Sequence, residues 1–294
     1  MTQTTISRLG LWCWLDGYPY AECIAIAQQA EQLGYGALWI PEAVGRDPFV
    51  SLAVLARETD RLRLATGIAN IYARDAMAMN AARQSLDELS KGRLILGLGV
   101  SHSEMVSGMR HHDYGKPVAT MRRYLEQMDS ALYAGPAPQK TGLRVLAALR
   151  EKMLGLAAET CDGAHPYFVT PEHTARARAI LGPGKWLAPE QKVLLIQDAS
   201  EARAVARKAM ATYLDLQNYR NNLLTLGFTQ HDFEQGGSDR LVDAIVAWGD
   251  ERTIRDRIEA HWRNGADHVC IQTLRPDGQF GVEPRALQAF ASMG

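Results

Sequence analysis

Hydrophobic residues in this chain alternate between short continuous runs and longer stretches with helical spacing. In the clearest example, the runs LRLATGIAN and LILGLGVSH enclose residues 75–89, and the stop signal SKGR precedes the second run. Within residues 75–89, apolar side chains recur every three or four positions, which is the period of a helix buried along one face. The pattern therefore predicts a strand, a helix and a second strand, the repeating unit of a parallel sheet.

The same alternation continues along the chain. The runs that we expect to be strands lie at residues 9–15, 37–42, 62–70, 94–102, 144–149, 164–169, 192–197 and 268–274. Helical spacing separates them, and Asp47-Pro48 and Thr170-Pro171 are typical of an N-cap followed by proline at the first helical position. Eight strand–helix repeats favour an α/β fold of the (β/α)8 TIM-barrel type, with an open doubly wound sheet as the alternative.

Two segments depart from this alternation. Residues 103–116 are polar and longer than a typical connection, so we expect a loop there. Residues 217–249 are mostly helical in pattern, with polar starts, and are expected to form a helical insertion near the C-terminal part. No linker rich in proline or serine divides the chain, so residues 1–294 are expected to form a single barrel domain.

Composition narrows the class of protein. The 294 residues carry a formal charge of −1, with 47% hydrophobic and 22% charged residues, as is ordinary for a soluble globular protein. The balanced charge argues against nucleic acid and against an anionic membrane surface as partners. The start lacks the apolar core of a signal peptide and no run is long enough to span a bilayer, so we expect a cytoplasmic protein. The four cysteines are scattered without zinc spacing, so we expect free thiols and no metal.

The predicted strand ends, where ligands bind in such folds, argue against several chemistries. A Rossmann fingerprint would need a third glycine, whereas Gly97 and Gly99 run into a polar loop. No GxSxG elbow is present, and no strand end gathers histidines and carboxylates as a metallohydrolase would. What remains is cofactor chemistry with a flat ring and a phosphate tail. Gly67, Gly97 and Gly99 are unusual in predicted strands, and each indicates a bulge or a close approach by a ligand. The alternative is that they only relieve crowding inside a barrel.

Four segments carry a resemblance to a known family: LGYGALWIPE, LRLATGIAN, LDELSKGRLILGLGVSH and LAALREKMLGLAAETCDGAHPYFVTPEHT. In this order they resemble the luciferase-like monooxygenase superfamily, and in particular its branch of oxidoreductases that use the deazaflavin coenzyme F420. The resemblance implies a (β/α)8 barrel with an insertion and a flavin or deazaflavin ring over the strand ends. It also implies that the third strand ends in a bulge with a non-prolyl cis peptide behind the ring, at Gly67-Ile68.

The resemblance further implies which residues hold the cofactor. The ring would contact two strand ends, at Thr66, Gly67, Ile68, Gly99 and Val100. The phosphate tail would contact the loop after residues 144–149 and a second turn, at Ala148, Leu149, Arg150, Gly163 and Ala164. A helix N-terminus can hold such an anion and Arg150 would add charge-assisted hydrogen bonds, although Arg150 could instead form a surface salt bridge with Glu151 or a neighbour.

For the chemistry, His102 lies close to the position where deazaflavin-dependent sugar-phosphate dehydrogenases of the family carry a catalytic glutamate. His102 is therefore the candidate proton donor, and the alternative is a merely hydrogen-bonded barrel residue. Glu42 matches the acidic residue of strand two, but Ala43 replaces the histidine that follows it in those relatives. Glu42 could orient a histidine or bind the cofactor, or be a buried carboxylate paired for structure. Candidates for the substrate pocket, by position only, are Trp14, Asn70, Tyr72, His111 and Tyr114.

Three functions are compatible with the resemblance. The first is an F420-dependent oxidoreductase that moves a hydride between the deazaflavin and a small organic substrate. The second is an FMN-dependent monooxygenase that uses O2, and the third is a non-catalytic flavin-binding protein of the same fold. Because family members are often dimers, a homodimer is expected.

Overall fold

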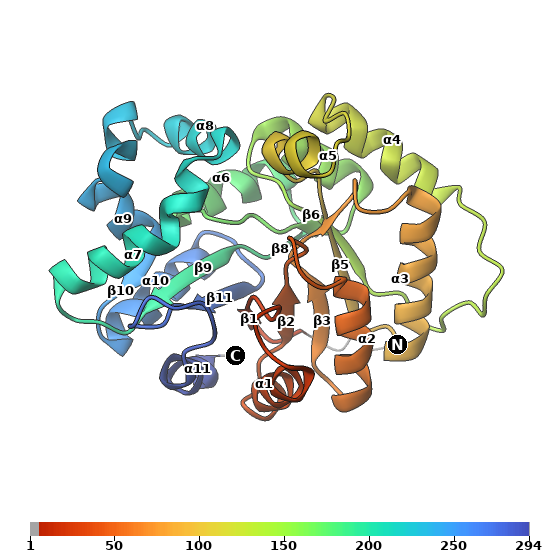
Figure 1. Cartoon of the computed structure of the whole chain (residues 1–294), viewed down its shortest axis with the longest axis horizontal. Coiled ribbons are helices and arrows are strands. Elements are labelled where there is room, and N and C mark those ends of the chain that lie inside the picture. The colour runs from red at the N-terminus through yellow and green to blue at the C-terminus, as the bar shows by residue number, and fades with distance from the viewer. Residues whose placement is uncertain (1–5, 294) are drawn as a thin grey trace.

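Parallel strands form the centre of the molecule and helices cover its outer side (Figure 1). The computed structural model describes residues 6–293. The strands that follow one another around the centre are β1 Leu9–Trp12, β2 Ala37–Ile40, β3 Arg63–Thr66, β5 Leu94–Gly99, β6 Leu143–Leu146, β7 Gly163–Ala164, β8 Trp186–Leu187, β9 Glu190–Leu194 and β11 Val269–Thr273. Two short strands are added to them, β4 Ala69–Asn70 beside β5 and β10 Val246–Trp248 beside β9.

One chain segment, residues 186–194, closes the sheet into a barrel. Its first part, β8, pairs with β7, and its second part, β9, pairs with β11, which in turn pairs with β1. Only Ala188 and Pro189 separate the two parts. The backbone hydrogen bonds continue across them, because Ala188 N donates to Ala164 O at 2.9 Å and Cys270 N donates to Pro189 O at 3.0 Å. The barrel predicted from eight repeats is therefore confirmed, and the open sheet is excluded.

The inside of the barrel is filled by side chains from alternate positions of its strands. They form one buried cluster that includes Trp12, Trp39, Ala65, Ile95, Val145 and Cys270. A larger cluster lies between the outer faces of the strands and the helices. A core on both sides of the sheet explains why the strands are almost uninterrupted apolar runs in the sequence.

The helices follow the strands as the hydrophobic spacing predicts. Those around the barrel are α1 Tyr20–Gln32, α2 Pro48–Glu58, α3 Ala76–Ser90, α4 Pro117–Asp129, α5 Glu151–Thr160, α6 Pro171–Leu181, α7 Ala199–Leu214, α10 Glu251–Arg263 and α11 Pro284–Phe290. Both predicted N-caps are confirmed. Asp47 accepts a hydrogen bond from Phe49 N at 2.8 Å, and Thr170 accepts one from His173 N at 3.4 Å.

Three segments differ from the prediction. The expected loop at 103–116 contains a π-helix, η1 Glu104–Met109, whose Val106 is buried. The strand expected at 164–169 ends after Ala164. Pro166, which has no backbone N–H, stands where that strand was expected to continue. The segment 217–249 contains α8 Gln217–Thr225, the 3-10 helix η2 Gln230–Gly236 and α9 Asp239–Ile245, but it ends in a strand, β10. A short 3-10 helix, η3 Ala291–Met293, follows α11.

All four cysteines are buried free thiols. Among residues 6–293, no helix has both the length and the apolar character needed to cross a bilayer.

Candidate functional site

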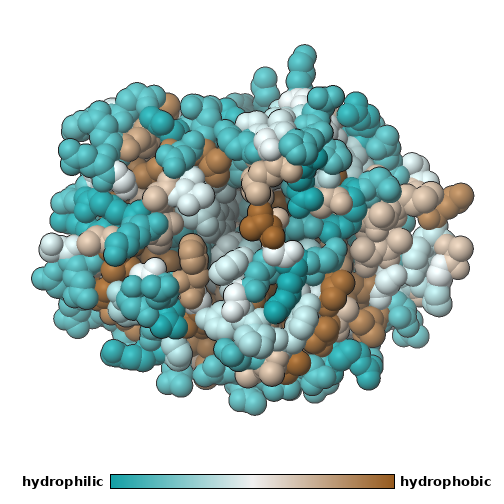
Figure 2. Space-filling view, in the orientation of Figure 1, coloured by the Kyte–Doolittle hydropathy of each residue, from teal (hydrophilic) through white to brown (hydrophobic). Residues whose placement is uncertain are grey.

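A bulge at the end of β3 lies at the carboxyl ends of the barrel strands. The peptide bond between Gly67 and Ile68 is cis, as the resemblance implies. The neighbouring strands hold the bulge: Trp12 Nε1 donates to Gly67 O at 3.1 Å, and Glu42 N donates to Ile68 O at 3.1 Å. We call the region around this bulge, at the ends of β1, β3, β5 and β7, the barrel mouth. A hollow is visible near the centre of the face shown in Figure 2, below α5 and α8.

The three glycines singled out in the sequence make room for this bulge. A Cβ on Gly97 would lie 2.1 Å from Thr66 O, and a Cβ on Gly99 would lie 2.5 Å from Ile68 Cδ1. A Cβ on Gly67 would lie 2.7 Å from Trp12 Nε1. The close approach is thus made by the chain itself, which supports the interpretation that these glycines relieve crowding. Thr66 is fully buried and its hydroxyl donates to Gly97 O at 2.7 Å, so it supports the bulge from behind.

Glu42 is engaged on both of its oxygens. Arg74 donates to Oε1 at 2.6 Å and to Oε2 at 2.9 Å, and Asn70 N donates to Oε2 at 2.7 Å. The side chain is 7% exposed. These contacts match the paired-carboxylate interpretation, in which Glu42 fixes the chain that follows the bulge.

Two buried polar atoms near the bulge have no hydrogen-bond partner among the residues that the structure describes. They are Asn70 Nδ2, a donor, and His165 Nε2. His165 Nδ1 lies 2.7 Å from Ala188 O, so Nδ1 carries the proton and Nε2 is an acceptor. Burial lowers the pKa of His165 to about 4, so the ring is neutral at pH 7. A buried donor and a buried acceptor without partners suit an uncharged heterocycle with polar edges.

His102 is half-buried on the β5 side of the mouth. Its ring centroid lies 5.3 Å from that of Tyr219 on α8. Burial lowers the pKa of His102, so its imidazole is neutral at pH 7 and is a weak source of protons. The rings of Tyr72 and Tyr114 stack beside this strand end, with their centroids 5.9 Å apart. The Tyr114 hydroxyl donates to Ser101 O at 3.0 Å.

The other predicted substrate residues lie at the rim. Trp14 is half-buried and its Nε1 donates to Asp16 at 3.2 Å, while its ring contacts the exposed Phe280 edge-on. His111 is exposed, with a φ of 57°, so the structure does not bring it together with His102. Asn70 and Tyr72 lie next to the bulge.

The predicted phosphate end lies between β6 and α5. Arg150 is the exposed N-cap residue of α5, and its Nη2 donates to Asn218 Oδ1 at 3.3 Å. Among the ion pairs within residues 6–293, none involves Arg150, so the expected alternative with Glu151 does not form. Packing explains the glycine at position 163, because a Cβ on Gly163 would lie 1.8 Å from Trp186 O. Ala164 is fully buried inside β7.

Sequence reasoning missed a polar group inside the barrel. Glu190 and Lys192 form an ion pair at 3.2 Å, and each side chain is 1% exposed. Lys192 Nζ donates to the Tyr167 hydroxyl at 3.0 Å. The sequence did contain a signal: two charges of opposite sign stand two residues apart directly before the apolar residues 193–196, which places both on one face if the strand includes them.

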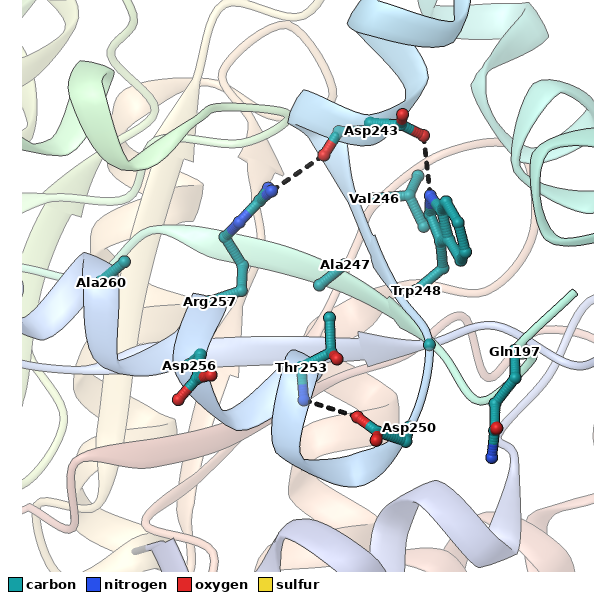
Figure 3. Close-up of a pocket in the computed structure, with 11 residues that line it drawn as sticks. Gln197, Asp243, Val246, Ala247, Trp248, Asp250, Thr253, Asp256, Arg257 and Ala260 are labelled. Atoms are coloured by element: carbon teal, nitrogen blue, oxygen red, sulfur yellow. Dashed lines mark hydrogen bonds between the residues drawn. The ribbon is translucent and has the colours of Figure 1, made fainter. Parts of the chain in front are cut away.

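Cavities also lie outside the mouth. One of about 590 Å³ opens between β10 and α10 (Figure 3), and its polar groups largely satisfy one another: Trp248 Nε1 donates to Asp243 at 2.8 Å, and Thr253 N donates to Asp250 at 2.8 Å. A second, of about 300 Å³, borders the chain after the bulge at Ile71 and Tyr72. Within residues 6–293, no three His, Cys, Asp or Glu side chains gather in a way that could hold a metal ion.

The sequence model of the family described as luciferase-like monooxygenase matches residues 5–268. A Mycobacterium tuberculosis protein provisionally named a coenzyme F420-dependent oxidoreductase is 32% identical over 194 residues, covering 56% of this chain and 55% of that protein. The chain spans about half the length of the curated relatives it matches, 55% and 49% for two of them.

Solved structures share the fold. An F420-dependent secondary alcohol dehydrogenase in complex with an F420–acetone adduct superposes with a TM-score of 0.74 at 12% identity, over 98% of both chains. A second structure is the oxygenating constituent of 3,6-diketocamphane monooxygenase from Pseudomonas putida, in complex with FMN. It superposes with a TM-score of 0.71 at 16% identity, over 98% of this chain and 97% of that one. At these identities the similarity establishes the barrel fold alone.

Proposed function

This chain belongs to the luciferase-like monooxygenase family, and from that membership we propose that it is an oxidoreductase that binds coenzyme F420 at the barrel mouth and acts on a small organic molecule. The observation that carries the proposal is the pair of buried polar atoms without partners, Asn70 Nδ2 and His165 Nε2, in the neighbourhood of the Gly67-Ile68 bulge. The polar edge of a flavin or deazaflavin ring presents acceptors and donors of this kind. The name given to the mycobacterial relative favours F420 over FMN.

The residues at the mouth would divide the work as follows. Ile68, with Gly99 and Val100 behind it, would support one face of the ring, and Ala148, Leu149 and the exposed Arg150 would hold the phosphate tail at the start of α5. When bound, the deazaflavin supplies a hydride acceptor or donor at its C5 atom. Glu42 would keep the chain after the bulge in place, and the neutral His102 would contact the substrate beside Tyr219.

A cofactor titration of the purified chain tests the proposal. We expect F420 to bind with at least tenfold lower Kd than FMN, measured by the change in cofactor fluorescence. Tighter binding of FMN, together with oxygen consumption, would instead favour the FMN-dependent monooxygenase. Binding without turnover of any carbonyl or unsaturated probe would favour the non-catalytic flavin-binding protein.

Replacing Arg150 with alanine is expected to weaken F420 binding about tenfold, because one charge-assisted hydrogen bond is worth roughly 1.5 kcal/mol. The variant should also lose part of the salt dependence of binding, since screening acts on the charge that was removed. Arg122→Ala is the matched control: Arg122 is exposed on α4 and paired with Glu159 at 2.6 Å. Equal Kd values for the two variants would contradict the phosphate assignment.

We also propose that two copies associate through the edge formed by α2 and α3. Three apolar side chains are exposed at this edge, namely Val44 at 69%, Val50 at 57% and Met77 at 55%. The two helix starts lie together, because Arg74, which precedes α3, donates to Asp47 at 2.9 Å. Light scattering should give a dimer for the native chain and a monomer for Val50→Glu/Met77→Glu, while Leu132→Glu, at a site 84% exposed after α4, stays dimeric. A monomeric native chain would rule this out.

A further inference from the structure

A buried ion pair faces the inside of the barrel from β9. Glu190 and Lys192 are on the same side of the strand, whereas Gln191 between them faces outward and its side chain contacts His261 of α10 at 3.0 Å. Removing two charges from water costs several kcal/mol for each ion, and the fold of a barrel does not require such a pair. A buried pair beneath a ligand-binding mouth is therefore a candidate for function.

The ammonium group of Lys192 is directed at aromatic side chains. It lies 3.0 Å from the Tyr167 hydroxyl, 4.1 Å from the centroid of the Tyr167 ring and 4.7 Å from that of Tyr213. A cation at these distances is attracted to the faces of both rings as well as to the hydroxyl oxygen. Glu190 fixes the ammonium from the other side at 3.2 Å and itself accepts from Phe168 N at 3.2 Å.

Tyr167 connects this pair to the mouth. Its hydroxyl donates to Gln272 Oε1 at 2.9 Å and lies 2.6 Å from the Tyr213 hydroxyl. A charged lysine can only donate, so the Tyr167 oxygen accepts from Lys192. The proton of Tyr167 is directed at Gln272 Oε1, the acceptor whose place a substrate oxygen would take. The centroid of the Tyr167 ring lies 5.1 Å from that of the Trp12 ring, and the indole N–H of Trp12 donates to Gly67 O. Tyr167 and Tyr213 are partly exposed, whereas Lys192 and Glu190 are not.

We propose that Tyr167 is the proton donor to the substrate at the barrel mouth, and that Lys192, held by Glu190, is a positioning residue that places positive charge behind its hydroxyl. The inference rests on the proposed function. It replaces His102 as the source of the proton, since His102 lies beyond Tyr219, whose ring centroid is 6.3 Å from that of Tyr167.

The step balances for a carbonyl substrate with a reduced deazaflavin as the reductant. The carbonyl carbon gains a hydride and forms a C–H bond, while the electron pair of the C=O bond moves to oxygen. The O–H bond of Tyr167 breaks and its proton forms the new O–H bond of the alcohol. The phenolate left on Tyr167 is stabilised by the Lys192 ammonium and regains a proton from the Tyr213 hydroxyl, 2.6 Å away, which solvent then reprotonates.

Several other titratable groups face Tyr167 or Lys192 and influence their pKa values. They are Glu190 on β9, Tyr213 on α7, Tyr219 on α8 and Cys270 on β11. Burial raises the pKa of Tyr167, so its native phenol stays protonated in the range where the fold is stable. To measure how the Lys192 charge affects the ionisation of this phenol, a more acidic phenol is therefore needed at position 167.

The experiment places trifluorotyrosine at position 167 of the full chain and follows its ionisation by fluorine NMR. The titration is repeated with Glu190→Gln/Lys192→Met, which removes both charges together so that neither is left buried alone. We expect the midpoint to rise by about one pH unit or more when the pair is removed. Trifluorotyrosine at position 114 is the control, because the Tyr114 hydroxyl donates to Ser101 O on the other side of the mouth.

Turnover gives the second measurement. With F420 in its reduced form and cyclohexanone and benzaldehyde as probes, Tyr167→Phe should lower the rate about 100-fold while the Kd for F420 changes less than twofold. Lys208→Met, at an exposed lysine of α7, should leave the rate unchanged. Equal midpoints with and without the pair, or a rate in Tyr167→Phe within threefold of the native one, would overturn the inference. Failure of the native chain to bind F420 would overturn the proposed function, whereas a shifted midpoint would still support the charge behind Tyr167.

Discussion

Replacing Lys192 with methionine is expected to lower the free energy of unfolding by about 3 to 5 kcal/mol. The substitution leaves Glu190 inside the barrel, 1% exposed, without its counterion. Lys192 partly offsets the rise in the pKa of the Glu190 carboxyl that burial causes, so removing the lysine raises that pKa further above its value in the unfolded chain. Urea unfolding followed by circular dichroism measures the loss.

The pH dependence of the variant gives an independent check. Because the folded state then binds the Glu190 proton more tightly than the unfolded state, the loss of stability is largest at high pH and decreases as the carboxyl becomes protonated. We expect Lys192→Met to be less destabilised near pH 5 than near pH 8. Glu190→Gln/Lys192→Met, which leaves no unpaired charge, should recover most of the stability. A double variant as unstable as the single one would show that the pair is needed for packing and not for charge balance.

Replacing Gly97 with alanine is expected to cost about 3 kcal/mol, at the upper end of what overpacking usually costs. The added Cβ would lie 2.1 Å from Thr66 O, a backbone atom that cannot move without shifting the bulge. The same shift should weaken F420 binding at least tenfold, since the ring is proposed to lie on Ile68. Urea unfolding and the cofactor titration measure the two effects.

Gly155→Ala is the matched control for this substitution. Gly155 lies inside α5, and a Cβ there would meet nothing within 4 Å. Alanine at this position should stabilise the fold by about 0.5 to 1 kcal/mol and leave cofactor binding unchanged. If Gly97→Ala were as stable as Gly155→Ala, the crowding explanation for the glycines of β5 would be wrong.

Much of the barrel could be predicted from the sequence, because local pattern determines it. Strands buried on both faces are short apolar runs, helices show the 3.6-residue period, and the caps at Asp47 and Thr170 are specified by the residues themselves. The cis peptide at Gly67-Ile68 came from the family resemblance and not from the pattern. Gly97 and Gly99 were identified as special, but what approaches them, Thr66 O and the Ile68 side chain, depends on the register between β3 and β5.

Contacts between residues far apart in the sequence could not be predicted in this way. Glu42 pairs with Arg74, 32 positions later in the chain, and Lys192 with Tyr167, 25 positions earlier. Arg150 contacts Asn218, 68 positions away. Such pairs depend on how the strands and the loops after them are arranged in the folded barrel, and hydrophobic spacing does not encode that arrangement. A predicted strand at 192–197 also excluded Glu190, so the charge that accompanies Lys192 was not recognised.

The ladder between β1 and β11 has a consequence for biosynthesis. Leu9 pairs with Val269, so β1 has no partner on one side until the chain has been translated as far as β11. Until then an apolar strand edge is open to other nascent chains, and β-edges of this kind promote aggregation. We therefore expect chains shortened before residue 269 to accumulate as insoluble material, and the production of this protein to depend on chaperones that cover this edge.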